Sequence, residues 1–298
     1  MLSQPNAVFI GVDGGGSRTR VRIADQAGTP IAGAEGGSAN VYLAPDTAVQ
    51  TIMDTIERAA LAAGLERGTL SHAALGLGLA GISSPLIAAQ VEARFAGRFA
   101  RVRASDDAIV ACLGAHAGRD GGLVIAGTGS AAVVRTGDRQ INLGGRGFLL
   151  GDDGSGAVMG RQAWRRALRA HDGLEASTPL LQGLMAEFDH DPVAVITWGR
   201  HATSSQYGAY APRILSAAQE CDPAALSIAN EAASAIEELV VATRRHGARR
   251  VSLVGGLAAP LRPFLGRTCL DSLTSPLRDA LDGALILAGA SFGLPIPD

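Results

Sequence analysis

The chain has 298 residues, of which 47% are hydrophobic and only 4% aromatic, and its formal net charge at pH 7 is −2. This length exceeds the size at which single hydrophobic cores usually divide, so we expect two domains. The charge balance argues against nucleic acid as a main partner, because binding a phosphate backbone requires a concentrated basic surface. No apolar run reaches the ~18 residues of a membrane span, so no membrane partner is expected.

Three cysteines, Cys112, Cys221 and Cys269, lie far apart and form no CxxC pair. This spacing predicts neither a disulfide framework nor an iron–sulfur cluster within one chain, and it fits a reducing compartment. The N-terminus has no basic segment ahead of an apolar stretch, the signature of a secretory signal peptide. Together these features predict a cytoplasmic protein.

A glycine-rich, acidic turn at residues 11–19 (GVDGGGSRT) separates two apolar segments that both have the pattern of strands. Apolar residues and arginines alternate over residues 19–23, so we expect the chain to double back as a hairpin. Glycines let backbone N–H groups approach phosphate oxygens closely, and Asp13 is a candidate ligand for Mg²⁺, directly or through water. The predicted phosphate contacts of this turn are Asp13, Gly14, Gly15, Gly16, Ser17 and Thr19.

The same pattern returns about 114 residues later, which indicates an internal repeat. An apolar segment at residues 122–126 leads into Gly127, Thr128, Gly129 and Ser130, and a turn follows at residues 136–138. Two glycine hairpins, one in each half, could hold a polyphosphate from opposite sides of a hinged cleft, as in actin, hexokinase and the sugar kinases. A third glycine pair, Gly255 and Gly256, follows an apolar strand and precedes a helix, where adenosine could lie.

Helices and strands alternate between and after these turns, which predicts an α/β fold. We expect the first lobe to span residues 1–117, with the helix at residues 281–293 as a candidate to complete it, and the second lobe to span residues 118–280. Asp46 is the expected N-cap of the first helix. The predicted strands include residues 31–34, 73–80 and 251–254, and the predicted helices include residues 46–64, 86–95, 109–116, 155–170, 178–188, 191–201 and 223–246.

Phosphoryl transfer to a hydroxyl requires a carboxylate within hydrogen-bond reach of that hydroxyl. Asp107 is the best candidate for this base because it lies at a strand-to-helix turn 20 residues before the second glycine loop. Capping of the helix by Asp106 or Asp107 explains the same position equally well. At a second acidic turn we expect Asp153 to cap the following helix, which leaves Asp152 freer to bind a ligand.

Several of these segments together resemble the BadF/BadG/BcrA/BcrD-type ATPase and N-acetylglucosamine kinase family, and the resemblance extends over nearly the whole chain. Some stretches, such as GSAN at residues 37–40 and GSGAVMG at residues 154–160, are most similar to bacterial glucosamine kinases. The segments that carry the family resemblance are residues 11–19, Ser38-Ala39-Asn40, Asp107-Ala108, residues 127–130, residues 144–147 and residues 151–155.

The resemblance implies a two-domain, actin-like ATPase fold with ribonuclease H-like lobes, as in the sugar kinase and hexokinase superfamily. It implies MgATP as the phosphoryl donor and an amino sugar as the acceptor. Asp107 falls on the family's catalytic base, where it also contacts the substrate, and Ser17 and Thr128 fall on phosphate-contacting positions. The positions that match the family's sugar-binding residues are Asn40, Gly145, Arg146, Gly147 and Asp152.

The acceptor predicted in this way is glucosamine, whose 6-hydroxyl would be phosphorylated to give glucosamine 6-phosphate and ADP. Related N-acetylglucosamine kinases have a cysteine and a tryptophan where this chain has Leu143 and Tyr42, so the pocket for an acetyl group is in doubt. An ammonium group needs carboxylate or carbonyl acceptors, which Asp152 or Asp153 could supply. N-acetylglucosamine remains the alternative acceptor, and the residues leave a homodimer open.

Other classes of protein fit the sequence less well. An activator ATPase of the dehydratase or reductase type shares the fold but needs paired cysteines that hold a cluster between subunits. A metal hydrolase is disfavoured because the six histidines show no HxxxH or HxH spacing and no GxSxG elbow occurs.

Overall fold

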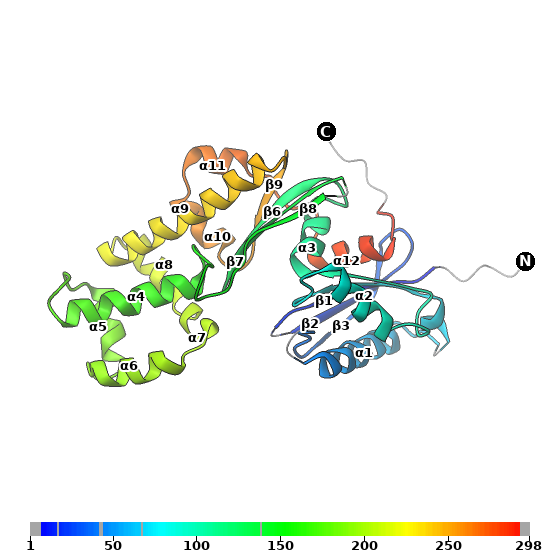
Figure 1. Cartoon of the computed structure of the whole chain (residues 1–298), viewed down its shortest axis with the longest axis horizontal. Helices are drawn as coiled ribbons and strands as arrows, with labels where there is room; N and C mark the ends of the chain where they lie inside the picture. Colours follow the sequence, from blue (N-terminus) through cyan, green and yellow to red (C-terminus); the bar gives the residue numbers. More distant parts are fainter. Residues whose placement is uncertain (1–6, 17, 42–43, 67, 138, 293–298) are drawn as a thin grey trace, which may run out of the picture. The chain divides into compact units, whose positions relative to one another are not determined.

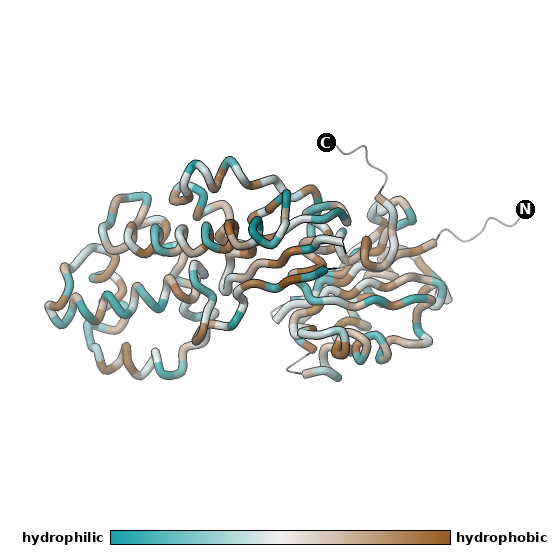
Figure 2. The backbone as a smooth tube through the Cα atoms, turned by 45° about the horizontal axis from the view of Figure 1, so that its top comes forward, coloured by the Kyte–Doolittle hydropathy of each residue, from teal (hydrophilic) through white to brown (hydrophobic). Residues whose placement is uncertain are grey.

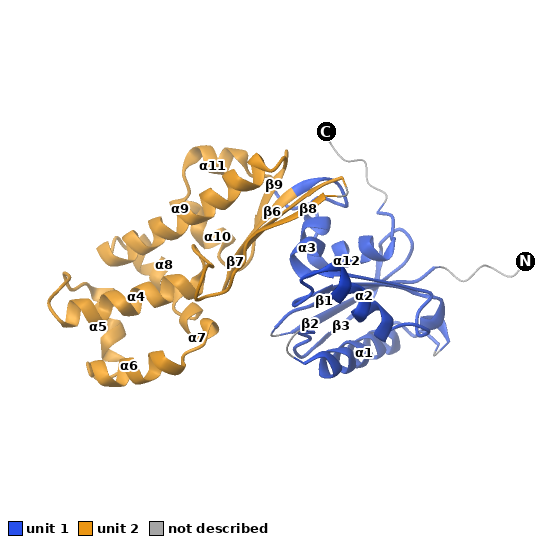
Figure 3. Ribbon diagram, in the orientation of Figure 1, with its two compact units in different colours: residues 1–121, 275–298 blue, residues 122–274 orange. Residues whose placement is uncertain are grey.

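The computed structural model describes residues 7–16, 18–41, 44–66, 68–137 and 139–292. Two predicted residues, Ser17 and Tyr42, therefore lie outside the described part of the chain. Contacts within the chain divide it into two compact units (Figure 3): unit 1 comprises residues 1–121 and 275–298, and unit 2 comprises residues 122–274. Unit 1 is thus assembled from two separate stretches of the chain.

Unit 1 is built on a five-stranded sheet with the order β3-β2-β1-β4-β5. Strands β1, β2 and β3 form an antiparallel meander, and β1, β4 and β5 run parallel to one another. The predicted hairpin around the first glycine turn is confirmed, with Gly14 paired to Thr19 at its end. The strands are β1 (Phe9–Gly14), β2 (Thr19–Ala24), β3 (Pro30–Gly36), β4 (Ala74–Leu79) and β5 (Arg101–Asp106).

Helices cover both faces of this sheet (Figure 1). Alternate residues of β1 point to opposite faces: Ile10 and Val12 join the core cluster that contains α1, whereas Phe9 packs with the C-terminal helix α12. The helical elements of unit 1 are α1 (Pro45–Ala62), η1 (Thr69–His72), α2 (Pro85–Arg94), α3 (Asp107–Ala115) and α12 (Ala280–Ala288).

Helix α12 lies unusually close to its neighbours because glycines line the contact. A Cβ atom at Gly11 of β1 would lie 2.7 Å from the carbonyl oxygen of Leu281. A Cβ at Gly76 of β4 would clash with the carbonyl oxygen of Ala284, and one at Gly114 of α3 would clash with that of Asp279. The backbone of α12 therefore occupies the space that side chains would fill.

The first helix begins differently from its prediction. Ala44, and not Asp46, is the N-cap of α1, and the cap makes no hydrogen bond through its side chain. Proline occupies the first turn, where its missing N–H costs nothing and its fixed φ angle suits a helix. Asp46 forms an ion pair with Arg94 of α2 instead.

Unit 2 repeats the plan of unit 1 on a four-stranded sheet with the order β8-β7-β6-β9. An antiparallel pair of strands, β7 and β8, is followed across the sheet by β6 and β9, which run parallel to each other. Leu273 adds an isolated parallel bridge to Val251 of β9. The strands are β6 (Gly121–Ala126), β7 (Ser130–Thr136), β8 (Arg139–Gly144) and β9 (Val251–Val254).

Helices supply most of the core of unit 2. The buried side chains of the sheet, such as Val124 and Val134, form one cluster with residues of α4, α5, α8 and α9. Hydrophobic residues, drawn in brown, follow the strands of both sheets (Figure 2). Helices α7, α8 and α11 were not predicted. The helical elements are α4 (Gly156–His171), α5 (Pro179–Ala186), α6 (Pro192–His201), α7 (Ser204–Gly208), α8 (Ala211–Gln219), α9 (Pro223–Arg245), α10 (Ala258–Leu261), η2 (Arg262–Phe264) and α11 (Arg267–Ser272).

The two units confirm the predicted α/β fold with two like-built halves. Among the helices of the described residues, none combines the length and apolar character that crossing a membrane requires.

Close packing of α12 predicts that Gly283→Ala destabilises unit 1, because the new Cβ would clash with the carbonyl oxygen of Val110 in α3. We expect a loss of at least ~2 kcal/mol, measured by thermal or denaturant unfolding. Gly68→Ala is the matched control, because nothing lies within 4 Å of its Cβ position. Equal stability of the two variants would contradict this account of the packing.

Candidate functional site

In unit 1, three parallel strands end at the same edge of the sheet. The register pairs Gly14 of β1 with Leu79 of β4, and Leu79 with Asp106 of β5. Asp107 follows as the first residue of α3. The structure therefore brings the first glycine turn and the predicted base to one edge, where ligands commonly bind in open α/β sheets.

The two adjacent aspartates at this edge have different roles. Asp106 is the N-cap of α3, and its carboxylate accepts hydrogen bonds from the backbone N–H groups of Ala108, at 3.0 Å, and Ile109, at 3.4 Å. The carboxylate of Asp107 accepts from the N–H of Ala108 at 2.9 Å. Because Asp106 satisfies the helix end, Asp107 is not required as the cap.

The surroundings of Asp107 disfavour its ionised form. Burial raises the pKa of its carboxyl group from an ordinary value of 3.8 to about 6, and the negative charges of Asp106 and Asp13 contribute. The hydrogen bond from Ala108 acts in the opposite direction. A carboxylate with this pKa is a stronger base than an exposed aspartate and still ionised at neutral pH.

Asp13 lies at the end of β1, directly opposite Arg20 of β2 in the antiparallel register. The Nε of Arg20 donates to Oδ2 of Asp13 at 3.1 Å, and a second guanidinium nitrogen forms an ion pair with the same oxygen. The partnership with Arg20 was not predicted, although the hairpin register contained the necessary signal.

The rest of the first glycine turn divides into structural and open positions. A Cβ at Gly14 would lie 2.6 Å from a methyl carbon of Leu79, whereas nothing lies within 4 Å of a Cβ at Gly16. Thr19 is fully buried, and its hydroxyl donates to the carbonyl oxygen of Gly37 at 2.7 Å. Thr19 was predicted to contact phosphate, but this bond already uses the proton of its hydroxyl group.

Asn40, a predicted sugar-binding residue, belongs to a segment that is fastened to the same turn. The backbone N–H of Ala39 donates to the carbonyl oxygen of Gly15 at 3.1 Å. Asn40 is half-buried beside this bond. Asn40 thus directly follows Ala39, the residue that is hydrogen-bonded to the first glycine turn.

In unit 2, the second glycine loop (residues 127–130, which we name the phosphate loop after its predicted role) lies against the start of α4. The carbonyl oxygens of Gly127 and Thr128 accept hydrogen bonds from the N–H groups of Gly156, at 2.8 Å, and Ala157, at 3.1 Å. The side chain of Thr128 is exposed. The side chain of Thr128 is therefore accessible, whereas the first N–H groups of α4 are already bonded to the loop and to Ser155.

The third glycine pair lies next to this loop. Gly255 has a φ angle of +101°, and a Cβ there would clash with the carbonyl oxygen of Ala126, the last residue of β6. The N–H of Leu257 donates to that same carbonyl at 3.0 Å. Gly256 faces open space. The structure therefore brings the second and third predicted nucleotide contacts together.

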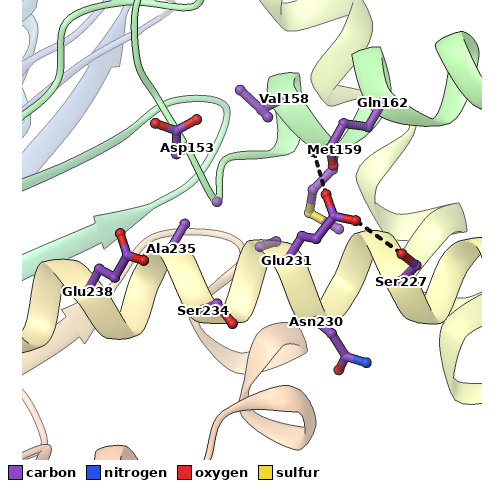
Figure 4. Close-up of a pocket in the computed structure, with 12 residues that line it drawn as sticks. Asp153, Val158, Met159, Gln162, Ser227, Asn230, Glu231, Ser234, Ala235 and Glu238 are labelled. Carbon is purple, nitrogen blue, oxygen red and sulfur yellow. Dashed lines mark hydrogen bonds between the residues drawn. The ribbon is translucent and has the colours of Figure 1, made fainter.

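Asp152 and Asp153 have different surroundings. A Cβ at Gly129 would lie 2.9 Å from Oδ2 of Asp152, so that carboxylate lies directly over the phosphate loop. Asp153 instead lines a cavity of about 600 Å³ between α4 and α9, together with Glu231 and Glu238 (Figure 4). Neither aspartate caps α4, because Ser155 provides the capping side chain and its Oγ accepts from Val158.

The predicted sugar-binding positions Gly145, Arg146 and Gly147 follow β8 in a glycine-rich segment (residues 144–147, the GGRG segment). Gly145 and Gly147 have φ angles of +64° and +83°, which favour glycine. Arg146 is exposed. The segment continues into Phe148, which packs against Tyr207 with ring centroids 5.3 Å apart and against the guanidinium of Arg161.

Sequence and structure comparisons identify relatives of this chain. The model of the BadF/BadG/BcrA/BcrD ATPase family matches residues 10–265. The glucosamine kinase GspK of Vibrio cholerae is 37% identical over 286 residues, covering 94% of this chain and 95% of that protein. A crystal structure of a candidate N-acetylglucosamine kinase from Chromobacterium violaceum, 34% identical, has a TM-score of 0.86 and covers 95% of this chain and 99% of that chain.

More distant structures share the fold alone. A ROK family glucokinase from Streptomyces griseus, solved with glucose and a nucleotide analogue, has a TM-score of 0.54 at 18% identity. It covers 94% of this chain and 99% of that chain. Together with the Chromobacterium violaceum structure, this match confirms the predicted actin-like fold class.

The raised pKa of Asp107 predicts how its replacement changes stability with pH. Its folded-state pKa of about 6 lies above the ordinary value of 3.8, so ionising it in the folded protein costs free energy at high pH. Asp107→Asn should therefore stabilise the protein by about 1–3 kcal/mol at pH 8. The gain should shrink as the pH falls through 6 and vanish below about 4.

Thermal unfolding between pH 4 and pH 8 measures this difference. Asp191→Asn makes the same chemical change at the exposed N-cap of α6 and should show no such pH-dependent gain. A constant difference between wild type and Asp107→Asn at every pH would contradict the assigned surroundings of Asp107.

Proposed function

Because this chain belongs to the BadF/BadG/BcrA/BcrD ATPase family, we propose that it uses ATP to phosphorylate the 6-hydroxyl of glucosamine, giving glucosamine 6-phosphate and ADP. The observation that carries this proposal is the half-buried Asp107, with a raised pKa, at the sheet edge that also ends in the first glycine turn. The similarity to the Vibrio cholerae glucosamine kinase over 94% of the chain supports it.

Asp107 would accept the proton of the attacking hydroxyl. Its surroundings hold its pKa near 6, so it is ionised at neutral pH yet has a higher proton affinity than an exposed aspartate. Because Asp107 is the first residue of α3, the helix also fixes the direction of the backbone at Asp107. Because little covalent chemistry is needed for phosphoryl transfer, positioning of this carboxylate supplies much of what the protein contributes.

Residues of both units would bind MgATP. In unit 1 the proposed contacts are Gly14, Gly15 and Gly16, of which Gly16 faces open space, whereas the N–H of Gly15 already donates to the carbonyl oxygen of Arg18 at 2.9 Å. In unit 2, Thr128 offers an exposed side chain. Gly255 and Gly256 would lie along the adenosine. Asp13 suits Mg²⁺ because its side chain is partly exposed, its Oδ2 is oriented by Arg20, and Mg²⁺ usually binds one or two carboxylates while keeping waters. Bound Mg²⁺ would neutralise negative charge on the phosphates.

For the sugar, we propose contacts from Asn40, Gly145, Arg146, Gly147 and Asp152. N-acetylglucosamine is the second candidate acceptor, and the observation in its favour is the 34% identity to the Chromobacterium violaceum structure. We place the reaction in the cytoplasm, where the free thiols of Cys221 and Cys269 would stay reduced.

Replacement of Asp107 tests the proposed base. Asp107→Asn should lower kcat by at least ~10² and leave the affinity for MgATP nearly unchanged, because the amide keeps the shape but accepts no proton. For the wild type, kcat/KM should fall as the pH drops through about 6, where Asp107 becomes protonated. Normal turnover by Asp107→Asn would refute the assignment.

An assay of ADP release with several acceptors tests the substrate. With glucosamine, N-acetylglucosamine, glucose and mannosamine compared under identical conditions, we expect the highest kcat/KM for glucosamine, because the carboxylate of Asp152, one of the proposed sugar contacts, can receive its ammonium group. Turnover of N-acetylglucosamine alone would replace the proposed acceptor while leaving the kinase reaction intact.

A further inference from the structure

Ser130, the last residue of the phosphate loop, is bonded through each of its polar groups to the GGRG segment or to the residues that follow it. Its backbone N–H donates to the carboxylate of Asp152. Its carbonyl oxygen accepts from the N–H of Gly145 at 3.1 Å. Its hydroxyl donates to the carbonyl oxygen of Asp153 at 2.7 Å, and the residue is 4% exposed. Three bonds thus join two loops that are adjacent in space but distant in sequence.

Among these bonds, the carboxylate of Asp152 is the one contributed by a side chain of the second loop. It accepts hydrogen bonds from two backbone N–H groups, one at Ser130 in the phosphate loop and one at Gly147 in the GGRG segment. Burial raises the pKa of Asp152, and these two hydrogen bonds oppose the rise. A carboxylate that joins two backbone donors holds both loops at a fixed separation.

The backbone around Asp152 is built to deliver this carboxylate. Asp152 has a φ angle of +60°, a region that non-glycine residues adopt rarely and at a cost. On the other side, Gly129 leaves space, because a Cβ there would lie 2.9 Å from Oδ2 of Asp152. An unfavourable backbone angle and an absent side chain therefore combine to place one carboxylate over the phosphate loop.

We propose that Asp152 is a positioning residue for nucleotide binding: its carboxylate ties the phosphate loop to the GGRG segment, so that the affinity for nucleotide depends on it even when no sugar is bound. This inference rests on the proposed function in one respect, because residues 127–130 are taken to bind the phosphates of ATP. A residue that only contacts the sugar would have no such effect.

The tie also connects the two substrates. The proposed sugar contacts Gly145 and Gly147 are hydrogen-bonded to Ser130 and to Asp152, respectively. A sugar that orders the GGRG segment would therefore order the phosphate loop as well. Nucleotide and sugar should then each strengthen the binding of the other by the same factor.

The test measures the dissociation constant of MgADP without sugar, by calorimetry on the full chain. In Asp152→Asn, the amide nitrogen cannot accept a bond and the remaining oxygen carries no charge, so the hydrogen bonds from the two backbone donors weaken. The bonds that join Ser130 to Gly145 and to Asp153 remain. We expect MgADP to bind at least ~10-fold more weakly. Asp153→Asn is the matched control: the same change at the next residue, whose carboxylate lines the cavity of Figure 4, should leave the constant unchanged.

A double-mutant cycle distinguishes loss of the Asp152 contact with the phosphate loop from general loss of structure. Gly129→Ala alone should weaken MgADP binding, because its Cβ displaces the carboxylate of Asp152. In the background of Asp152→Ala, which removes that carboxylate, Gly129→Ala should have a clearly smaller effect, since the two changes disturb the same contact. Strictly additive effects would contradict the proposal.

Unchanged MgADP binding by Asp152→Asn, together with weaker glucosamine binding, would overturn the inference and leave Asp152 as a sugar contact only. Failure of the wild-type protein to bind MgADP at all would instead overturn the proposed function. Dissociation constants of MgADP with and without glucosamine complete the test, because the coupling between the two ligands should be lost in Asp152→Asn.

Discussion

Backbone contact between α12 and its neighbours is the constraint on which unit 1 depends. Gly11 and Gly76 allow α12 to lie directly on the sheet, and Gly114 and Gly283 allow it to cross α3 backbone to backbone. Arg22 of β2 adds hydrogen bonds to Asp279 and Asp282 at the start of the same helix. The position of α3 fixes Asp107, its first residue, so the chemistry proposed for this carboxylate depends on a contact made at the other end of the chain.

The carboxylates at the end of the sheet show how one fold assigns different roles to similar groups. Asp106 receives two backbone hydrogen bonds and completes a helix. Asp107 is buried beside that negative charge and has a raised pKa. Asp13 is paired with an arginine on the neighbouring strand. Local hydrogen bonding and charge, more than residue type, decide which of them is suited to accept a proton.

Much of this arrangement can be predicted from local sequence, and some of it cannot be. The glycine hairpins, the alternating elements and a cap at Asp106 or Asp107 were predictable because turn residues and apolar periodicity act over short distances. The N-cap of α1 was predicted wrongly at Asp46, because the signal of the proline at its start outweighs a nearby acidic residue. The need for glycine at position 76 gave no local signal, because the backbone that leaves no room for a side chain there is that of Ala284, about two hundred residues away. The two surroundings of Asp152 and Asp153 depend in the same way on loops that meet only in the folded protein.

The division of unit 1 into two stretches affects how the protein folds as it leaves the ribosome. Unit 2 is continuous in sequence, so all of its strands and helices emerge before α12 is made. Until then the residues of β1 that pack on α12, such as Phe9, have no covering helix. Domains generally fold as units, and apolar surface exposed during synthesis favours aggregation. Part of one face of the N-terminal sheet therefore stays uncovered until α12 is made, after every element of unit 2.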